Sequence, residues 1–167
     1  MSNGVSHYDS IDGWPSNDLV FLTLDLECDY GTAITSNTYE AASRTEVLID
    51  VLESTDVPLT CFLQTKVLDV APGAVDRLRD ASIPVEFHAH SHTHAARWEA
   101  DVEYEVRESV DRIRNNFDTD PLGYRFPDGE IRPVDYKILA ENDIPFSASV
   151  FPSWRPGRFN NIKFPLF

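Results

Sequence analysis

Short apolar segments alternate with amphipathic segments along most of the chain. Apolar runs rich in β-branched and aromatic residues predict buried strands, whereas apolar residues that recur every three or four positions predict helices. The expected strands are LVFLTLDLE (19–27), VPLTCFLQT (57–65), IPVEFHAHS (83–91), a fourth that ends in GYRFPDG (123–129), and IPFSASVFP (144–152). The expected helices cover residues 38–54, 71–82, 100–117 and 134–143.

Two of these helices have an apolar face that should pack against the strands. The residues expected on these faces are Val47, Leu48, Val51 and Leu52 in the first helix, and Val102, Val106, Val110 and Ile113 in the third. The regular alternation predicts an α/β protein with a parallel sheet, and both a doubly wound sheet and a (β/α) barrel satisfy it. No GxGxxG follows the first strand, which disfavours a dinucleotide-binding fold. In either architecture, functional residues gather at the carboxyl ends of the strands.

The length of 167 residues indicates a single domain. Residues 1–17, rich in serine, asparagine, aspartate and glycine, are interpreted as a polar leader before a domain at 18–167. No signal peptide and no membrane-spanning segment is expected, and a cytoplasmic location follows as the default. Cys28 and Cys61 are not in a ligand-spaced set, so they are expected to be reduced thiols in the core.

The net charge of −14 changes the expectation for partners. Acidic residues number 28 against 14 basic ones, and the only lysines are Lys66, Lys137 and Lys163. Such a surface is similar to that of proteins from salt-loving organisms, where salt screens the self-repulsion. It also argues against nucleic acid as a partner.

Two carboxylates stand at the end of the first expected strand. Side chains alternate along a strand, so Asp25 and Glu27 point to the same side, whereas Leu26 points to the other. The pair could simply reach into solvent where the strand ends. Buried, it would need a metal ion or an arginine nearby.

Four histidines crowd the end of the third expected strand, in VEFHAHSHTH (85–94). A spacing of four residues allows two imidazoles to converge on one metal ion when the segment is helical. Both His90 with His94 and His88 with His92 have this spacing, so spacing alone leaves two pairings open. A solvated histidine-rich loop is the alternative without function.

An arginine follows the fourth strand in RFPDG (125–129). Proline and glycine in a tight loop would hold the Arg125 guanidinium rigidly, and it could then orient a carboxylate. An ordinary surface arginine in a structural turn is the other interpretation.

Taken together, these segments resemble the polysaccharide deacetylase family, also called the NodB-homology domain or carbohydrate esterase family 4. TLDLECDYG (23–31) is similar to the family's first motif, commonly T-F-D-D-G, and HSHTH (90–94) matches the second, H-[ST]-x-x-H. RFPDG matches the third, R-x-P-x-G, and FSASVFPSW (146–154) is similar to the strand of the fourth. The resemblance spans about residues 20–154, and its second and third motifs are the most specific.

The resemblance implies a (β/α) barrel of the deacetylase type, incomplete at the C-terminus, that removes N-acetyl groups from an amino sugar in a poly- or oligosaccharide. His90 and His94 would bind a divalent metal ion, most commonly zinc, with cobalt, nickel and manganese as alternatives. Asp25 would be the general base and Arg125 would orient it. The family's adjacent aspartates are replaced here by Asp-Leu-Glu, so Glu27 is the expected ligand carboxylate and Asp29 the alternative.

The remaining residues near the motifs are expected to line the substrate-binding rim, with a place behind the metal ligands as the alternative for the two other histidines. They are Tyr30, His88, His92, Phe126, Pro127, Asp128 and Trp154. In the family, a later histidine protonates the leaving amine, and this sequence has no histidine after residue 94. Separately, an incomplete barrel would leave an exposed sheet edge, which a second copy of the chain is expected to cover. Two other functions stay open: an amidohydrolase for a small cyclic amide or ureide, similar to allantoinase, and a catalytically silent metal-binding domain.

Overall fold

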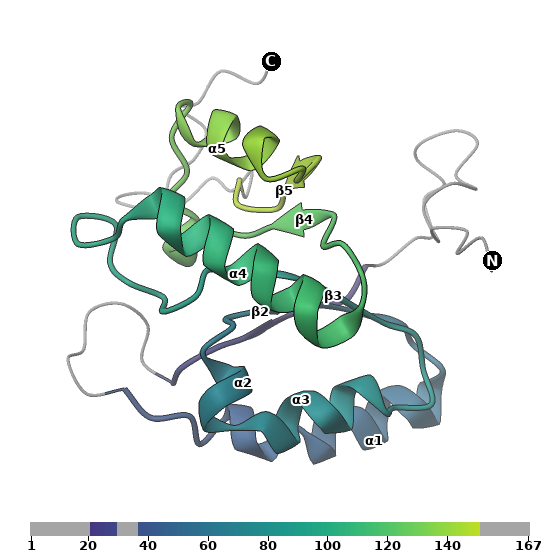
Figure 1. Cartoon of the computed structure of the whole chain (residues 1–167). Coiled ribbons are helices and arrows are strands. Elements are labelled where there is room, and N and C mark those ends of the chain that lie inside the picture. The colour runs from purple at the N-terminus through teal and green to yellow at the C-terminus, as the bar shows by residue number, and fades with distance from the viewer. Residues whose placement is uncertain (1–20, 30–36, 151–167) are drawn as a thin grey trace, which may run out of the picture.

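A parallel five-stranded sheet organises the chain in the computed structural model, which describes residues 21–29 and 37–150 (Figure 1). The strands follow one another across the sheet in chain order. They are β1 (Thr23–Leu26), β2 (Leu59–Leu63), β3 (Val85–Ala89), β4 (Gly123–Tyr124) and β5 (Phe146–Ser147). This sequential order is that of a barrel wall. In a doubly wound sheet, by contrast, later strands are added on the other side of the first strand, so the strand order reverses there. Over the described residues, no pairing joins β5 back to β1.

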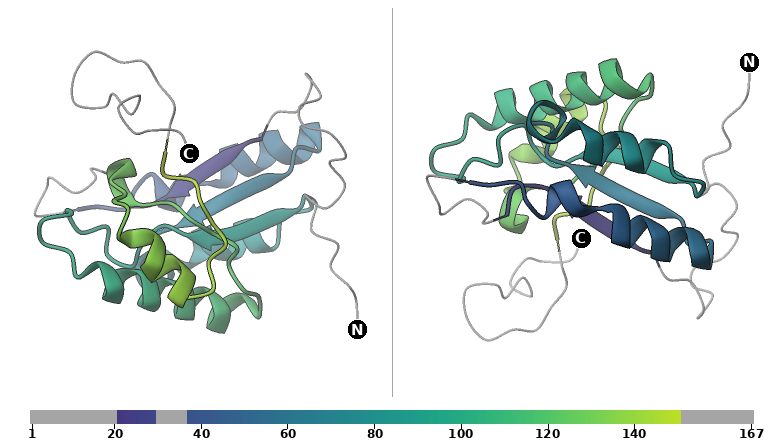
Figure 2. Two further views of the ribbon diagram at one scale, coloured as in Figure 1. Left: turned by 90° about the horizontal axis from the view of Figure 1, so that it is seen from above. Right: turned by 90° about the horizontal axis from the view of Figure 1, so that it is seen from below.

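Helices connect the strands. They are the 3-10 turn η2 (Ala42–Arg44), α1 (Glu46–Thr55), α2 (Val67–Val70), α3 (Pro72–Arg79), α4 (Val102–Phe117), the 3-10 turn η3 (Pro127–Gly129) and α5 (Asp135–Glu141). Helices α1 and α3 lie side by side along β1–β3, and α4 runs along β3 and β4 (Figures 1 and 2). No helix in the described ranges is long and apolar enough to cross a bilayer.

The apolar core lies on the helix-covered face of the sheet and falls into two clusters. The first joins strands β1–β3 to α1 and α3 through Leu26, Leu59, Cys61, Leu63, Phe87, Ile49, Leu52, Val75 and Leu78. The second joins β3 and β4 to α4 and α5 through Ala89, Tyr124, Val106, Val110, Ile113 and Leu139. Both cysteines are buried thiols, as expected, and burial raises the pKa of the Cys61 thiol.

The α/β class and the parallel sheet are confirmed, but the expected buried face of the first helix is wrong in part. Val47 and Val51 are mostly exposed, whereas Ile49 and Leu52 are buried. The helix starts at Glu46 instead of residue 38. Its apolar residues lie on several sides, so the sequence pattern did not identify a unique buried face. In α4, Val106, Val110 and Ile113 are buried as expected, whereas Val102 is only half-buried.

Gly123 of β4 has no room for a side chain. A Cβ at this position would lie 2.4 Å from the ring of Phe146, which also packs edge-on against His88 with 5.4 Å between ring centroids. We therefore expect Gly123→Ala to lower the free energy of unfolding by about 1–3 kcal/mol, measured by urea denaturation.

Gly73 of α3 provides the matched control. A Cβ there would meet its nearest neighbour, an Arg77 nitrogen, at an ordinary 3.7 Å. Gly73→Ala should raise the free energy of unfolding by about 0.5–1 kcal/mol, because alanine is the better helix former. If Gly123→Ala proved as stable as the parent chain, the close packing of Phe146 on β4 would be disproved.

Candidate metal centre

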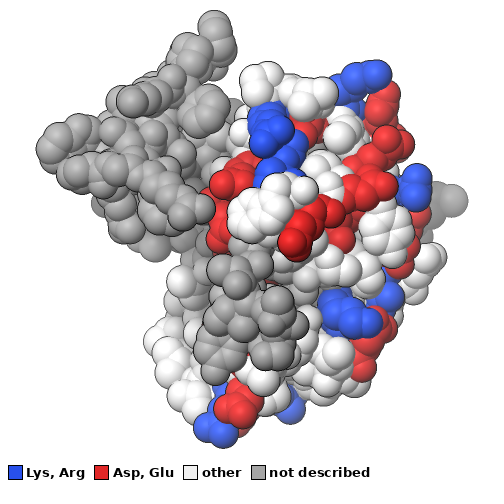
Figure 3. Space-filling model, turned by 90° about the vertical axis from the view of Figure 1, so that its left-hand side faces the viewer, with Lys and Arg blue, Asp and Glu red and all other residues white. Residues whose placement is uncertain are grey.

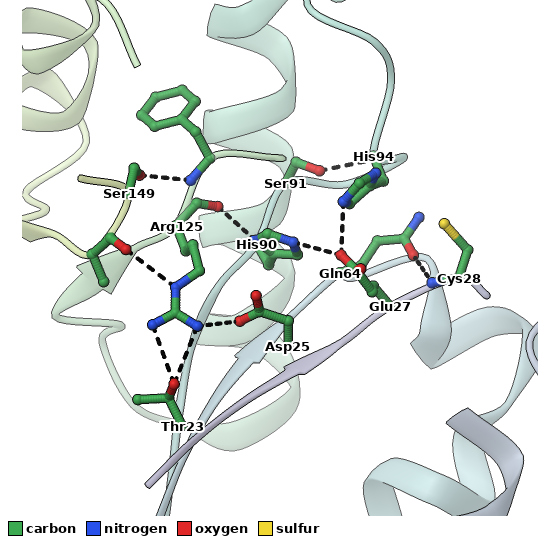
Figure 4. A network of polar contacts seen from close by, with 12 residues as sticks. Thr23, Asp25, Glu27, Cys28, Gln64, His90, Ser91, His94, Arg125 and Ser149 are labelled. Carbon is green, nitrogen blue, oxygen red and sulfur yellow. Dashed lines mark hydrogen bonds and ion pairs between the residues drawn. The ribbon is translucent and has the colours of Figure 1, made fainter. Parts of the chain in front are cut away.

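The polar face of the sheet carries the candidate functional residues. On the strands, each residue of the helix-covered face is followed by one that points to the opposite face. Asp25 of β1 is in register with Phe62 of β2, which in turn is in register with His88 of β3. Glu27 and His90 follow two residues further along β1 and β3, at the carboxyl ends of the strands. Figure 4 shows that side chains from the ends of β1, β3 and β4 converge here.

Glu27, His90 and His94 form a compact group of possible metal ligands. One carboxylate oxygen of Glu27 lies 2.7 Å from Nε2 of His90 and 2.7 Å from Nε2 of His94. The three donor atoms lie within 4.8 Å of one another, and both imidazoles are almost fully buried. Two imidazole nitrogens and one carboxylate oxygen are a donor set that suits a divalent transition-metal ion and leaves coordination positions open. Glu27, His90 and His94 are therefore a suitable set of ligands for a divalent metal cofactor.

The protein backbone orients His90. Its main-chain N–H donates to the carbonyl of Leu63 at 2.9 Å, and its Nδ1 lies 2.7 Å from the carbonyl oxygen of Arg125. An imidazole that donates through Nδ1 presents Nε2 to a metal, and such a contact fixes both the tautomer and the ring plane. The turn after β4 therefore helps to hold a residue at the end of β3.

His94 reaches the site from a loop, not from a helix. Ser91 and His94 both adopt left-handed backbone conformations, with φ of 62° and 60°. The N–H of His94 donates to the Ser91 hydroxyl at 3.0 Å, which closes the turn. The four-residue spacing thus brings the two rings together without a helical turn, with 5.0 Å between their centroids.

The contacts with the two imidazoles change the titration of Glu27. Burial opposes its ionisation, but the hydrogen bonds from His90 and His94 outweigh burial and lower the pKa of Glu27 to about 2. Burial likewise disfavours the charged form of His94, yet its contact with Glu27 raises the His94 pKa above the ordinary value. In the absence of a metal ion, the carboxylate and this histidine therefore form an ion pair wherever His94 is protonated.

Asp25 is held by Arg125 beside this group. The guanidinium forms an ion pair with the Asp25 carboxylate, donates to the Thr23 hydroxyl at 3.3 Å and to the Ala148 carbonyl at 3.2 Å. Its carbon lies 4.0 Å from the centre of the Phe62 ring. Arg125 is buried, whereas a third of the Asp25 side chain is exposed. The arrangement fixes the carboxylate while leaving part of it accessible.

The other predicted residues have different surroundings. Asp29 accepts hydrogen bonds from the Thr38 hydroxyl and from the main-chain N–H groups of Glu40 and Ala41, and it lies outside the Glu27 group. Phe126 is buried and its N–H donates to the Ser149 hydroxyl at 2.8 Å. Pro127 is half-buried and Asp128 is exposed next to it. Tyr30 and Trp154 lie outside the described residues.

His88 and His92 are buried, which agrees with a place behind the ligands and not with an exposed rim. His88 is 3% exposed, packed between Phe62 and Phe146, and burial lowers its pKa to about 4. The His92 ring is buried 3.0 Å from the Thr65 hydroxyl, and burial lowers its pKa as well. Both side chains therefore lie inside the fold. His88 packs against β2 and β5, and His92 lies between the segment after β2 and helix α4.

Two buried polar residues near the site were not anticipated. Gln64, at the end of β2, accepts from the N–H of Cys28 at 2.9 Å and so fixes the chain directly after Glu27. Glu105 of α4 accepts hydrogen bonds from the loop between His90 and His94. A polar residue that ends an apolar strand was the available signal for Gln64. For Glu105 the signal was its position one residue before Val106, on the apolar side of the helix.

Comparison with known proteins supports the family resemblance. A family model described as polysaccharide deacetylase matches residues 15–147, and the chain belongs to this family. A search of curated proteins found no match.

The fold is similar to solved deacetylases and to an inactive relative. The Streptococcus pyogenes deacetylase PplD, solved with acetate, superimposes with a TM-score of 0.62 at 15% identity, over 81% of this chain and 57% of PplD. A Streptomyces lividans family 4 carbohydrate esterase, also with acetate, gives 0.58 at 21% identity, over 78% of this chain and 62% of the esterase. A CE4 family pseudoenzyme from Bacillus anthracis gives 0.60 at 16% identity, over 76% of this chain and 41% of the pseudoenzyme. The chain thus spans about half the length of these proteins and shares their fold.

The Glu27–His94 pair predicts how the stability of the metal-free protein depends on pH. Glu27, with a pKa near 2 instead of 4.5, contributes stability that is present above pH 4.5 and is lost as the pH falls toward 2. His94, with a raised pKa, contributes stability that is present below pH 6.5 and is lost as the pH rises through its higher folded value. The pair should therefore stabilise the metal-free fold most between about pH 4.5 and 6.5.

Urea unfolding of the parent chain and of Glu27→Gln, both in a chelator, measures this effect. The stability difference between the two should be largest near about pH 5.5 and smaller near about pH 3 and pH 9. A difference that does not change across this range would show that Glu27 and His94 do not form the pair. Glu103→Gln, which changes an exposed acid of α4, serves as the control with no such maximum.

Proposed function

We propose that this chain is a metal-dependent hydrolase that removes N-acetyl groups from an amino sugar in a poly- or oligosaccharide. The observation that carries the proposal is the group of Glu27, His90 and His94, with the Asp25–Arg125 ion pair beside it at the same end of the sheet. Membership of the polysaccharide deacetylase family supports the reaction class.

Zinc is the first candidate for the metal, and cobalt, nickel and manganese accept the same donors. His90 and His94 would hold it through Nε2, and Glu27 through the carboxylate oxygen that faces both rings. Such an ion lowers the pKa of a water molecule and polarises the acetamide carbonyl. The contact of His90 with the Arg125 carbonyl directs Nε2 toward Glu27, where it would be available to the ion, and the buried setting of both rings would strengthen the interaction.

Asp25 is the proposed general base. Its carboxylate accepts a proton from the attacking water, the water oxygen bonds to the acetyl carbon, and the carbonyl becomes a tetrahedral oxyanion. Arg125 keeps the carboxylate in place through its ion pair, while Thr23 and the Ala148 carbonyl fix the guanidinium. When the C–N bond breaks, the leaving amine nitrogen needs one proton, and protonated Asp25 can return the one it took. Water and amide are thereby converted to acetate and amine.

The surface is compatible with a carbohydrate ligand. Figure 3 shows acidic and basic side chains interleaved on the face that lies at the left of Figure 1, and its described part has no broad basic surface. Polyanions require such a surface because phosphate contacts dominate their binding. A sugar, by contrast, depends on hydrogen bonds and apolar contacts, for which net charge is unimportant.

The proposal is tested by metal content and acetate release in parallel. The parent chain should bind about one divalent ion and release acetate from N-acetylglucosamine oligomers, whereas His94→Ala should lose the metal and the activity together. Asp25→Asn should keep the metal but lose activity by about a hundredfold to ten-thousandfold, because it removes the base and not a ligand. Glu103→Gln should match the parent in both measurements.

The other functions give different results in this experiment. Metal binding with no turnover of any acetylated sugar would identify a silent metal-binding domain. Turnover of cyclic amides or ureides in place of acetylated sugars would identify the allantoinase-like function. A folded parent chain that binds no metal would overturn the proposed mechanism altogether.

A further inference from the structure

Glu105 is a buried carboxylate in a helix that otherwise turns an apolar side to the sheet. It is 7% exposed, and its neighbours Val106 and Val110 are fully buried in the second core cluster. Removing a carboxylate from water is costly unless donors replace the lost solvent. The hydrogen-bond donors around Glu105 therefore indicate the role of a buried carboxylate at this position.

Within the described residues, the Glu105 carboxylate accepts three hydrogen bonds, and all of them come from the segment between His90 and His94. The main-chain N–H of His92 donates to one carboxylate oxygen at 2.8 Å, and the N–H of Thr93 donates to the same oxygen at 2.7 Å. The Thr93 hydroxyl donates to the other oxygen at 2.6 Å. Hydrogen bonds to an ionised acceptor are about twice as strong as neutral ones, so the carboxylate is a firm anchor for this turn.

The turn needs such an anchor because its backbone is strained. Ser91 and His94, neither of them glycine, both have positive φ. Each such residue costs of the order of 1–3 kcal/mol and persists only where its surroundings enforce it. On the other side of the turn, the N–H groups of Thr65 and Lys66 donate to the carbonyls of Ser91 and His92. These bonds hold the first half of the turn, and Glu105 is the residue that holds the second half.

His94 depends on this anchor more than His90 does. His90 is fixed by two backbone contacts of its own, from Leu63 and Arg125. Nδ1 of His94 is buried and, within the described residues, has no hydrogen-bond partner. Besides its contacts with Glu27 and with the ring of His90, the direction of the His94 ring therefore depends on the backbone of the turn.

We propose that Glu105 is a positioning residue for the metal centre, which places His94 through the backbone of His92 and Thr93. This inference rests on the proposed metal-dependent function. Residues that orient metal ligands typically change metal affinity by about 10–100-fold when they are replaced. Glu105 touches no ligand side chain, so its effect should appear in metal affinity and ligand geometry before it appears in the chemical step.

The experiment compares zinc affinity, by competition with a chromogenic chelator, in the parent chain, Glu105→Ala, Glu105→Gln and Glu108→Ala. Glu105→Ala should bind zinc about 10–100-fold more weakly. Glu105→Gln should lose less affinity than Glu105→Ala, because its amide oxygen can accept both N–H groups and its NH₂ can donate to the Thr93 hydroxyl, although bonds to a neutral acceptor are weaker. Glu108, on the same helix, forms an ion pair with Arg112 and, within the described residues, no hydrogen bond to the turn, so Glu108→Ala should bind zinc nearly as the parent does. Visible spectra of the cobalt forms report the ligand geometry separately.

Each outcome decides between the two proposals. A parent chain without metal affinity overturns the proposed function, whatever the variants do. A parent chain that binds zinc, with Glu105→Ala binding equally tightly and giving the same cobalt spectrum, overturns the role of Glu105. Thr93→Val covers the case in which Glu105→Ala does not fold, since Thr93 is exposed and this variant removes only one bond to the carboxylate. It should weaken zinc binding by a smaller factor, and unchanged affinity would again overturn the role.

Discussion

In β1, β2 and β3, the alternation of side chains separates packing from chemistry. Leu26, Cys61, Leu63 and Phe87 pack against the helices, and the residues between them point to the opposite face. Asp25 and Phe62 lie in register on that face, and Glu27 and His90 follow at the strand ends. Because the strands are parallel, every one of them delivers its last residues to the same edge. The core can therefore keep its apolar packing while the edge carries charged groups.

Arg125 connects the two halves of the candidate site. Its carbonyl oxygen accepts from His90, one of the proposed ligands, and its side chain holds Asp25, the proposed base. A movement of the turn after β4 would therefore shift His90 and Asp25 together. The Phe62 ring, on which the guanidinium stacks, further restrains the position of the Arg125 side chain.

The sequence predicted the strands and the residues that end them, because these follow from short-range periodicity. Asp25, Glu27, His90, His94 and Arg125 lie together at the carboxyl end of the sheet, where their positions after apolar runs placed them. The spacing alone did not distinguish His90 and His94 from His88 and His92, and the family resemblance made that choice. What periodicity could not give was burial that depends on distant segments. His88 and His92 are enclosed by Phe62, Phe146 and Thr65, and Glu105 is buried only because a strained turn offers it three donors. Val47 and Val51 show the converse, since apolar residues on a helix need not face the core.

Asp29 binds a segment of the chain that lies outside the sheet, through both its backbone and its side chain. Its main-chain N–H donates to the Thr38 carbonyl, and its carboxylate accepts from Thr38, Glu40 and Ala41. The chain that leaves the sheet after Glu27 is thereby tied to the chain that returns toward α1. Because Asp29 lies two residues after Glu27, the position of Glu27 depends in part on a carboxylate outside the candidate metal group. A change at Thr38, distant from the strands in the sequence, can therefore reach the candidate site through Asp29.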